Sequence, residues 1–231
     1  MSSEKNIPQM KKSIYTVLLL VAVAITCQAQ KKDWAGCSRY EQANADMTKA
    51  PAVVFMGNSI TEGWAAKHPE FFSANNYAGR GISGQVSSQM LCRFRDDVID
   101  LHPKAVVILA GTNDIALNNG PISVEHIFRN IVSMVELSRA NKIKAVLCSV
   151  LPVKKYGWRK EVDPVQPIKE LNEMLEKYAK EEKLPWVDFY TPMVTDDGAL
   201  NPAYTQDGVH PTAAGYEVME DIIAPVLKKF K

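Results

Sequence analysis

The chain has 231 residues, of which 46% are hydrophobic and 23% are charged. This composition excludes a disordered chain and fits one globular domain, which at this size buries roughly 70% of the surface of its unfolded chain. The formal net charge is +1, and no clustered lysines and arginines indicate a nucleic-acid-binding surface, so no nucleic acid is expected as a partner.

The start of the chain has basic residues, then an apolar run, and then small residues. Lys11 and Lys12 precede an apolar run, 14–27, that is too short to span a bilayer. This is the layout of a secretory signal peptide. We therefore expect residues 1–29 to be removed. Residues 30–231 would then form a single domain that is periplasmic or secreted and has no integral membrane span.

Two alternatives stay open for this segment. Met10 is an alternative start, because the residues before it are unusual ahead of a signal. Cys27 is an alternative site of lipidation, which would make the chain a lipoprotein anchored at that residue. Against this, Ala24-Ile25-Thr26 lacks the small residue expected just before a lipidated cysteine.

Three cysteines lie beyond the expected signal, and an odd number cannot all pair within one chain. Cys92 lies on a helical pattern and Cys148 in an apolar strand, so both are expected to be small core residues. With Cys37 as the third, a disulfide framework is not expected.

Apolar runs that end in glycine or proline alternate with helical stripes along the rest of the chain. Runs such as 104–110 and 144–150 are typical of buried parallel strands. In chain order, the sequence predicts a short helix or loop at 37–49, strands at 52–57 and 75–78, a helix at 86–98, a strand at 104–110, a helix at 124–135, a strand at 144–150, a helix at 168–178 started by Pro167, a strand at 186–189 and a helix at 212–229 bent at Pro225.

This alternation predicts an α/β fold with a five-stranded parallel sheet and helices on both faces. In open sheets of this kind, ligands bind outside the carboxyl ends of the strands. The residues that carry chemistry all follow strands and so fall on this one rim. They are Gly57-Asn58-Ser59, Gly79-Arg80-Gly81, Gly111-Thr112-Asn113-Asp114, the 152–166 loop, and Asp207 with His210 ahead of the last helix.

Three residues on the rim are those that a hydrolase with a serine nucleophile requires. The Ser59 hydroxyl needs a base to remove its proton, His210 is such a base, and Asp207 can fix the tautomer of the histidine. Each also has a plainer interpretation. Ser59 is a favoured helix N-cap residue, His210 between Val209 and Pro211 fits a turn, and Asp207 followed by glycine is a common turn dipeptide.

Two further rim residues could stabilise negative charge that develops on a reacting oxygen. Asn113 offers an amide N–H that does not ionise, and Gly81 lets its backbone N–H approach a substrate without an intervening side chain, although it equally fits a tight turn. His68, His102 and His126 are given no role. No cluster has the spacing of metal ligands, so neither a metal nor another cofactor is expected.

Taken together and in order, these residues resemble the SGNH (GDSL-like) hydrolase family of esterases and lipases, whose four blocks are marked by Ser, Gly, Asn and His. The matching blocks span residues 57 to 211, most of the expected mature chain. They are Gly57-Asn-Ser-Ile-Thr61, Gly79-Arg-Gly-Ile-Ser-Gly84, Gly111-Thr-Asn-Asp114 and Asp207-Gly-Val-His-Pro211.

The resemblance implies a flavodoxin-like three-layer sandwich and an acyl-enzyme mechanism that uses no metal. Ser59 would be the nucleophile, His210 the base and then the acid, and Asp207 the residue that orients the histidine. The backbone N–H groups of Ser59 and Gly81, with the Asn113 side chain, would form the oxyanion hole.

The sequence departs from the family pattern at two positions. Asn58 stands where aspartate is commoner, and Gly79 stands where asparagine is usual. Neither position carries the chemistry directly, so both departures concern the geometry of the loops around the site.

The 152–166 loop is long for a connection between a strand and a helix, and it lies on the rim. Tyr156, Trp158 and Arg159 in this loop, and Trp64 shortly after the first block, are candidate substrate-binding residues. Aromatic faces stack on sugar rings, and arginine can hold a carboxylate or phosphate. A solvated loop anchored by one tryptophan is the alternative.

No long apolar lid of the kind that a lipase places over acyl chains is evident in the sequence. We therefore expect a secreted serine esterase that hydrolyses short acyl esters, in particular O-acetyl groups on carbohydrate, with a small-molecule or glycan ester as its partner. A phospholipase or lysophospholipase, a thioesterase and a non-catalytic carbohydrate-binding relative are the alternatives. The oligomeric state stays open.

Overall fold

Five parallel strands form one sheet in the order β2-β1-β3-β4-β5, in a computed structural model that describes residues 33–230. The expected signal peptide, residues 1–29, lies outside the described residues. This strand order is that of flavodoxin-like folds. The strands are β1 Val53–Gly57, β2 Tyr77–Gly81, β3 Ala105–Leu109, β4 Lys144–Cys148 and β5 Trp186–Val187.

The strands are buried on both faces, which explains their nearly continuous apolar sequences. Successive side chains point to opposite faces, so that Val54 and Met56 pack into one core and Val53 and Phe55 into the other. The same alternation continues across β3 and β4. Each core is closed by a layer of helices, which gives the three-layer sandwich expected from the resemblance.

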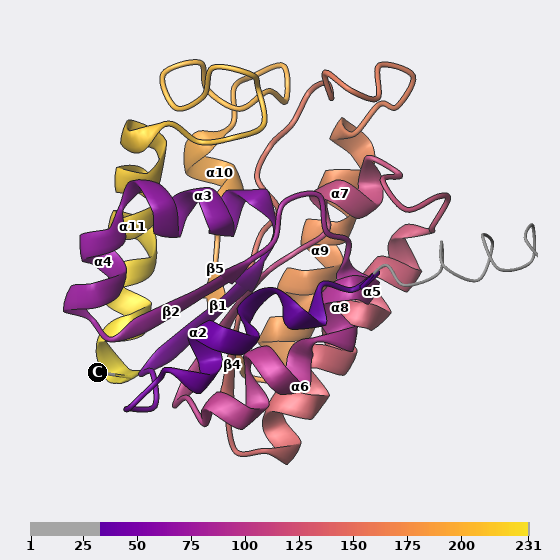
Figure 1. The fold of residues 1–231 in the computed structure, drawn as a ribbon. Helices are drawn as coiled ribbons and strands as arrows, with labels where there is room; N and C mark the ends of the chain where they lie inside the picture. Colours follow the sequence, from indigo (N-terminus) through magenta and orange to yellow (C-terminus); the bar gives the residue numbers. More distant parts are fainter. Residues whose placement is uncertain (1–32, 231) are drawn as a thin grey trace, which may run out of the picture. The chain divides into compact units, whose positions relative to one another are not determined.

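Helices cover both faces of the sheet (Figure 1). One face carries α3 Ser59–Lys67, α4 Pro69–Ala74 and α11 Ala213–Leu227, and the other carries α5 Ser87–Cys92, α6 Phe94–Asp97, α8 Val124–Ala140 and α9 Val165–Glu181. The shorter elements are η1 Cys37–Tyr40, α2 Glu41–Ala45, η2 Ile99–Leu101, α7 Thr112–Ile115, α10 Tyr190–Met193 and η3 Lys228–Phe230. Between residues 33 and 230, no helix is both long and apolar enough to cross a bilayer.

The predicted helix at 86–98 is wrong as a single element. It is divided into α5, α6 and η2, with breaks at Arg93 and Val98. The apolar stripe is nevertheless buried, because Met90, Phe94 and Val98 all point into the core. The backbone bends at Arg93, whose buried side chain forms hydrogen bonds with the ends of β1 and β2.

Other boundaries and environments also differ from the prediction: for example, α8 extends to Ala140 and β5 ends at Val187. Strand β2 runs to Gly81 instead of ending at residue 78, since its glycines let α3 approach closely: a Cβ on Gly79 would lie 2.7 Å from the Cβ of Ala65. Helix α9 begins at Val165, and Pro167 fits within its first turn because N–H groups there have no helical partner. Cys92 is exposed rather than in the core, whereas Cys148 is buried.

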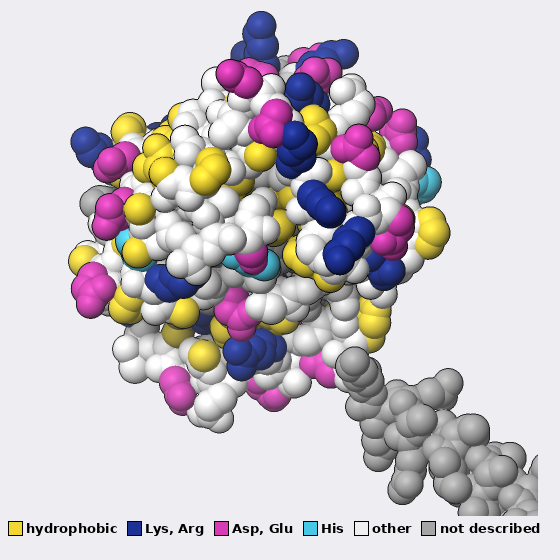
Figure 2. Space-filling view, turned by 90° about the horizontal axis from the view of Figure 1, so that it is seen from above, with side chains coloured by type: hydrophobic (Ala, Val, Ile, Leu, Met, Phe, Trp, Pro, Cys, Tyr) yellow, Lys and Arg dark blue, Asp and Glu magenta, His cyan; other side chains and the backbone are white. Residues whose placement is uncertain are grey.

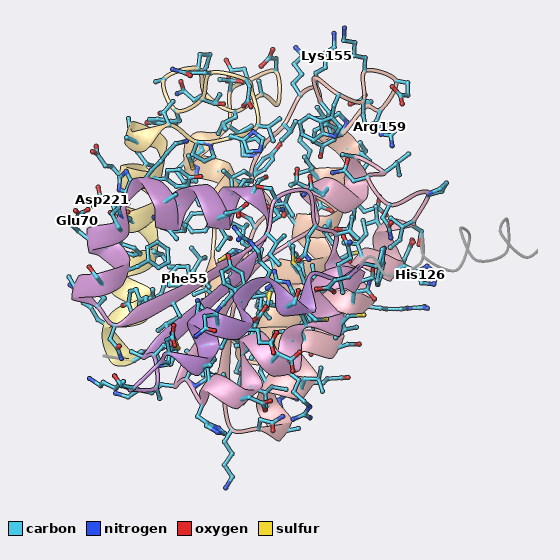
Figure 3. The ribbon with its side chains drawn as sticks, viewed as in Figure 1. Phe55, Glu70, His126, Lys155, Arg159 and Asp221 are labelled. Carbon is cyan, nitrogen blue, oxygen red and sulfur yellow. The ribbon has the colours of Figure 1, made fainter. Side chains whose placement is uncertain are left out.

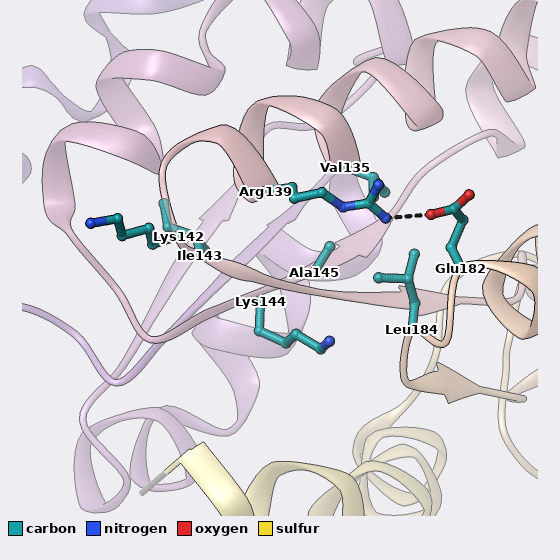
Figure 4. Close-up of a pocket in the computed structure, with 8 residues that line it drawn as sticks. All are labelled: Val135, Arg139, Lys142, Ile143, Lys144, Ala145, Glu182 and Leu184. Atoms are coloured by element: carbon teal, nitrogen blue, oxygen red, sulfur yellow. Dashed lines mark hydrogen bonds and ion pairs between the residues drawn. The ribbon is translucent and has the colours of Figure 1, made fainter.

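A cavity of about 450 Å³ lies beside the amino end of β4 (Figure 4). Its lining comes from α8, from β4 and from the segment that follows α9. Arg139 and Glu182 form an ion pair there, with 2.6 Å between nitrogen and oxygen. Because β4 begins at Lys144 beside this cavity, the cavity lies at the amino end of the strands, opposite to the end that carries the four sequence blocks.

Candidate active site

Ser59 is the first residue of α3, directly after the turn that ends β1. The N-cap position is held by Asn58, whose side-chain oxygen accepts a hydrogen bond of 3.0 Å from the backbone N–H of Ile60. Capping is thus carried out by Asn58, and the Ser59 hydroxyl is free for another partner. The departure from the commoner aspartate retains a good capping residue.

The Ser59 hydroxyl meets a histidine from the far end of the chain. Ser59 Oγ lies 2.9 Å from Nε2 of His210, and Nδ1 of His210 lies 2.7 Å from Oδ2 of Asp207. An ionised carboxylate only accepts hydrogen bonds, so it places the imidazole proton on Nδ1. Nε2 is then the acceptor for the Ser59 hydroxyl proton, which is the arrangement required of a general base.

The Asp207 carboxylate is held by the backbone of its own loop. Its Oδ1 accepts hydrogen bonds from the backbone N–H groups of Val209 at 2.9 Å and of His210 at 2.8 Å. Partial burial acts to raise the pKa of Asp207, but these bonds and the contact with the His210 ring outweigh it and lower the pKa to about 2. Asp207 is therefore ionised across the pH range in which proteins ordinarily work.

The sheet brings Gly81 and Asn113 to the same edge as Ser59. Gly81 is the last residue of β2 and pairs in register with Gly57 of β1. A Cβ on Gly81 would lie 2.2 Å from the backbone nitrogen of Glu62 and 2.6 Å from the carbonyl oxygen of Asn58, so only glycine fits against the first turn of α3. Asn113 is 3% exposed, and its Nδ2 donates to the Gln85 carbonyl at 3.0 Å.

Trp64 does not line the site, so its predicted role in substrate binding is wrong. The side chain is 1% exposed. Its ring packs with Phe55 at 5.4 Å and Tyr216 at 5.8 Å between centroids, and its Nε1 donates to Glu220 at 2.9 Å. Because α3 turns this face towards the sheet, Trp64 belongs to the core beneath Ser59.

Of the candidate substrate-binding residues in the 152–166 loop, Tyr156 is buried and Trp158 is exposed. Tyr156 is fully buried and donates its hydroxyl proton to the Thr112 carbonyl at 2.8 Å, so the prediction that it contacts substrate is also wrong. Its ring lies 5.1 Å from that of Trp158, which is 45% exposed and lies 6.4 Å from the His210 ring. Trp158 Nε1 donates to Asn118 at 2.8 Å, which fixes the ring beside the histidine.

Arg159 and Lys155 lie on the same loop, beyond the strand ends (Figure 3). Arg159 forms an ion pair with Glu161 at 3.7 Å. A cavity of about 890 Å³ separates this loop from the segment that carries Asp207, and its lining includes Lys154, Lys160 and Asp207. Seen from above, this face carries charges of both signs interspersed with scattered hydrophobic side chains (Figure 2).

The other histidines have separate surroundings. His68 pairs with Glu220 at 2.9 Å, His126 contacts the Ser123 hydroxyl at 3.1 Å, and His102 precedes β3 at the amino end of the strands. Within residues 33–230, no group of three or more histidine, cysteine, aspartate or glutamate side chains could hold a metal ion.

Sequence reasoning missed two residues that the structure connects to this site, Arg93 and Tyr40. Arg93 bonds to the Gly57 carbonyl at 3.1 Å, and the Tyr40 hydroxyl donates to the Gly81 carbonyl. Arg93 and Asp97 stand four apart, a spacing that ordinarily marks an exposed helical ion pair, so the sequence carried no signal of their burial.

A model of the GDSL-like lipase/acylhydrolase family matches residues 55–218. The chain belongs to this family. A crystal structure of a candidate acylhydrolase from Bacteroides fragilis is 52% identical, with a TM-score of 0.84, and the match covers 87% of this chain and 100% of that one. A GDSL-like lipase from Bacteroides thetaiotaomicron is 51% identical, with a TM-score of 0.83 over 85% and 99% of the two chains.

A shorter match joins the chain to a curated protein, the uncharacterized lipoprotein YqeF of Bacillus subtilis. The two are 38% identical over 76 residues, which are 32% of this chain and 31% of that protein. The chain therefore matches about a third of the length of this relative. The family resemblance read from the four blocks is confirmed by the family match, and the α/β fold with a five-stranded parallel sheet is confirmed by the structure.

Proposed function

We propose that this GDSL-family protein is a secreted serine esterase that removes short acyl groups, O-acetyl groups on carbohydrate foremost. The observation that carries the proposal is the continuous hydrogen-bonded chain from Ser59 through His210 to Asp207, with distances of 2.9 and 2.7 Å. A carbohydrate-binding relative that had lost turnover would have no need to keep all three groups in hydrogen-bond contact. The series of hydrogen bonds therefore favours an esterase over a non-catalytic binding protein.

The proposed reaction has two halves. Ser59 Oγ attacks the ester carbonyl carbon while His210 Nε2 takes the hydroxyl proton, and the alcohol then leaves with that proton, which gives an acyl-enzyme. Water attacks the acyl-enzyme with His210 again as base, and the carboxylic acid leaves as Ser59 regains its proton. Each oxyanion-hole donor, from Ser59, Gly81 or Asn113, would contribute about 3–4 kcal/mol to transition-state stabilisation.

Two features support a short acyl group and a sugar alcohol. Within residues 33–230, Trp34 and Trp158 are the exposed large hydrophobic side chains. Of these, Trp158 lies beside His210, where its ring can stack on a sugar. Each buried CH₂ of an acyl chain is worth about 0.8 kcal/mol, but only where an apolar surface receives it. The mixed charges on this face offer no such continuous surface.

The direct test is hydrolysis of p-nitrophenyl acetate, butyrate and octanoate by the wild type and by Ser59→Ala. We expect turnover that falls with chain length and is lost in the variant, while Ser73→Ala, which replaces an exposed serine of α4, keeps full activity. A fluorophosphonate should add its mass to Ser59 in the wild type. Turnover that survives in Ser59→Ala would contradict the mechanism, and a preference for octanoate would favour the phospholipase alternative.

Trp158 supplies a separate test of the carbohydrate. We expect Trp158→Ala to raise KM for an acetylated xylo-oligosaccharide about tenfold, corresponding to the loss of roughly 1–1.5 kcal/mol of stacking, and to leave KM for p-nitrophenyl acetate nearly unchanged. Trp158→Phe retains an aromatic face and should lose much less. Equal effects of Trp158→Ala on both substrates would remove Trp158 from the sugar site.

A further inference from the structure

The turn that carries Asp207 and His210 leaves both side chains open to solvent. The Asp207 side chain is 54% exposed and that of His210 is 36% exposed. Packing against neighbouring side chains is therefore incomplete, although proton transfer from Ser59 requires His210 to stay within hydrogen-bond reach. Hydrogen bonds within the turn have to supply the rest of the support.

A buried threonine lies inside this turn. Thr205 is 8% exposed, and its Oγ1 donates to the carbonyl oxygen of His210 at 2.8 Å. The same Oγ1 accepts the backbone N–H of Gly208 at 3.0 Å. It also lies 3.3 Å from Asp207 Oδ1, but a hydroxyl has one proton, and the shorter contact with the His210 carbonyl takes it. Thr205 thus makes one hydrogen bond as a donor and one as an acceptor, both to the backbone of the turn.

The two peptide units that flank the Cα of His210 are both anchored. The His210 N–H donates to Asp207 Oδ1 at 2.8 Å, and the His210 carbonyl accepts from Thr205. Each peptide unit is planar, so fixing both units fixes the direction of the Cα–Cβ bond between them. The imidazole extends along that direction, and its Nε2 lies 2.9 Å from Ser59 Oγ. The Thr205 hydroxyl therefore helps to determine where the base lies.

The same hydroxyl acts on the backbone of Asp207. The Gly208 N–H and the Asp207 carbonyl belong to one peptide unit, so the bond to Gly208 holds the carboxyl side of Asp207. At the other end of the turn, Thr205 pairs with Pro211 in an antiparallel bridge, directly after His210. One threonine thus connects the start of the turn to its end and to the two residues between them that carry the proposed chemistry.

We propose that Thr205 is a positioning residue, whose hydroxyl holds the backbone of Asp207 and His210 so that the imidazole stays within reach of the Ser59 hydroxyl. This inference rests on the proposed esterase function. The Thr205 hydroxyl bonds to the turn and acts through the two residues that it holds. Its loss should therefore slow proton transfer in both halves of the reaction and leave binding of the substrate ground state almost unchanged.

The test compares Thr205→Val, which has nearly the same volume but no hydroxyl, with Thr205→Ser, which keeps the hydroxyl. We expect Thr205→Val to lower kcat for p-nitrophenyl acetate about 30-fold with KM within about twofold, because a displacement of about 1 Å at a catalytic group can cost about 10²-fold in rate. Thr205→Ser should stay within about threefold of the wild type. The rate at which a fluorophosphonate modifies Ser59 should fall in parallel with kcat, since that reaction also needs His210 as base.

Thr195 provides a matched control in another turn. Its Oγ1 donates to Asp197 Oδ1 at 2.7 Å and accepts the backbone N–H of Ala199 at 3.1 Å. The turn at Thr195 carries neither Asp207 nor His210. Thr195→Val should therefore lower the midpoint of thermal unfolding about as much as Thr205→Val and leave kcat unchanged.

A second comparison separates positioning from a general loss of structure. In a His210→Ala background the base is absent, so a residue that acts through the base has nothing left to position. We expect Thr205→Val to leave the residual activity of His210→Ala unchanged within about twofold. If Thr205→Val does not fold, Thr205→Cys keeps a side chain of similar size, puts a weak donor in place of the hydroxyl, and should show the same pattern with a smaller fall in kcat.

Three results would contradict the inference and leave the esterase standing. They are full kcat in a folded variant that lacks the Thr205 hydroxyl, an equal fall in kcat in Thr195→Val, and an equal fall caused by Thr205→Val in the His210→Ala background. A wild type without Ser59-dependent turnover would instead overturn the proposed function, and this inference with it.

Discussion

At the scale of single residues, neighbouring side chains near Ser59 have separate tasks. Asn58 caps α3 through its hydrogen bond to the Ile60 N–H, which leaves the Ser59 hydroxyl to His210. A helix N-terminus also carries a partial positive charge, which favours negative charge on a group beside it. The adjacent pair of asparagine and serine therefore provides both a stable helix start and a hydroxyl in hydrogen-bond contact with His210.

Asp114, directly after Asn113, is a buried carboxylate whose ionisation should be visible in stability. Its oxygens accept from the Ser87 backbone N–H and hydroxyl. Burial raises its pKa to about 6, although these bonds act to lower it. Because the folded pKa lies above the unfolded one, the protonated form favours folding. That contribution is complete below about pH 4 and is lost as the pH rises through about 6.

The Asp114→Asn variant isolates this effect. We expect the free energy of unfolding of the wild type, relative to the variant, to fall by on the order of 2–3 kcal/mol between about pH 4 and pH 8. Urea unfolding at several pH values measures it. Asp221→Asn, at an exposed carboxylate of α11, should show no such trend. A difference between wild type and Asp114→Asn that does not change with pH would contradict the assignment.

At the scale of elements, the close contact between β2 and α3 makes Gly81 intolerant of any side chain. A Cβ there would lie within 2.2 Å of backbone in α3, and backbone cannot move aside as a flexible side chain can. We expect Gly81→Ala to destabilise the protein by about 2 kcal/mol or more. Because the added Cβ displaces α3, which carries Ser59, we also expect kcat to fall by about 100-fold.

Thermal unfolding and initial rates with p-nitrophenyl acetate measure both effects. Gly157→Ala is the control, because a Cβ on Gly157 would meet nothing within 4 Å. If Gly81→Ala is as stable and active as Gly157→Ala, then α3 does not pack as tightly against β2 as the structure has it.

The central strands could be predicted from the sequence because their environment is uniform. Strands β1, β3 and β4 are buried on both faces, so each appears as one apolar run, and the prediction placed them within two residues. Edge strand β2 contains two glycines that serve contacts with α3, and its apolar signal is correspondingly weak. The four sequence blocks identified the rim because the carboxyl ends of parallel strands must share one edge.

The parts that the sequence did not reveal depend on contacts between distant segments. Aromatic residues look alike whether they line a site or fill a core: Trp64 lies in a cluster of rings from β1, α4 and α11, whereas Trp158 is exposed. The break at Arg93 depends on carbonyl groups of β1 and β2. No local pattern around residue 93 encodes those partners.

At the scale of the whole molecule, export is the remaining prediction. We expect the protein purified from a secreting bacterial host to have the intact mass of residues 30–231, because residues 1–29 carry the layout of a signal peptide. Cys27→Ser should leave that mass unchanged. A start at Cys27 with added lipid mass, lost in Cys27→Ser, would establish the lipoprotein alternative. A mature protein that retains residues 1–29 would contradict both.

The pairing of Ser59 with His210 also has a consequence for biosynthesis. The two residues are 151 positions apart, and the Tyr216 hydroxyl, just beyond His210, bonds to the Ile60 carbonyl at 2.8 Å. The ribosome makes β1 and α3 long before it makes their partners, and contacts of such sequence separation form late in folding. A nascent or carboxy-terminally clipped chain would therefore hold Ser59 without its histidine partner. On the proposed mechanism, hydrolysis would begin only after the segment that carries His210 has docked against α3.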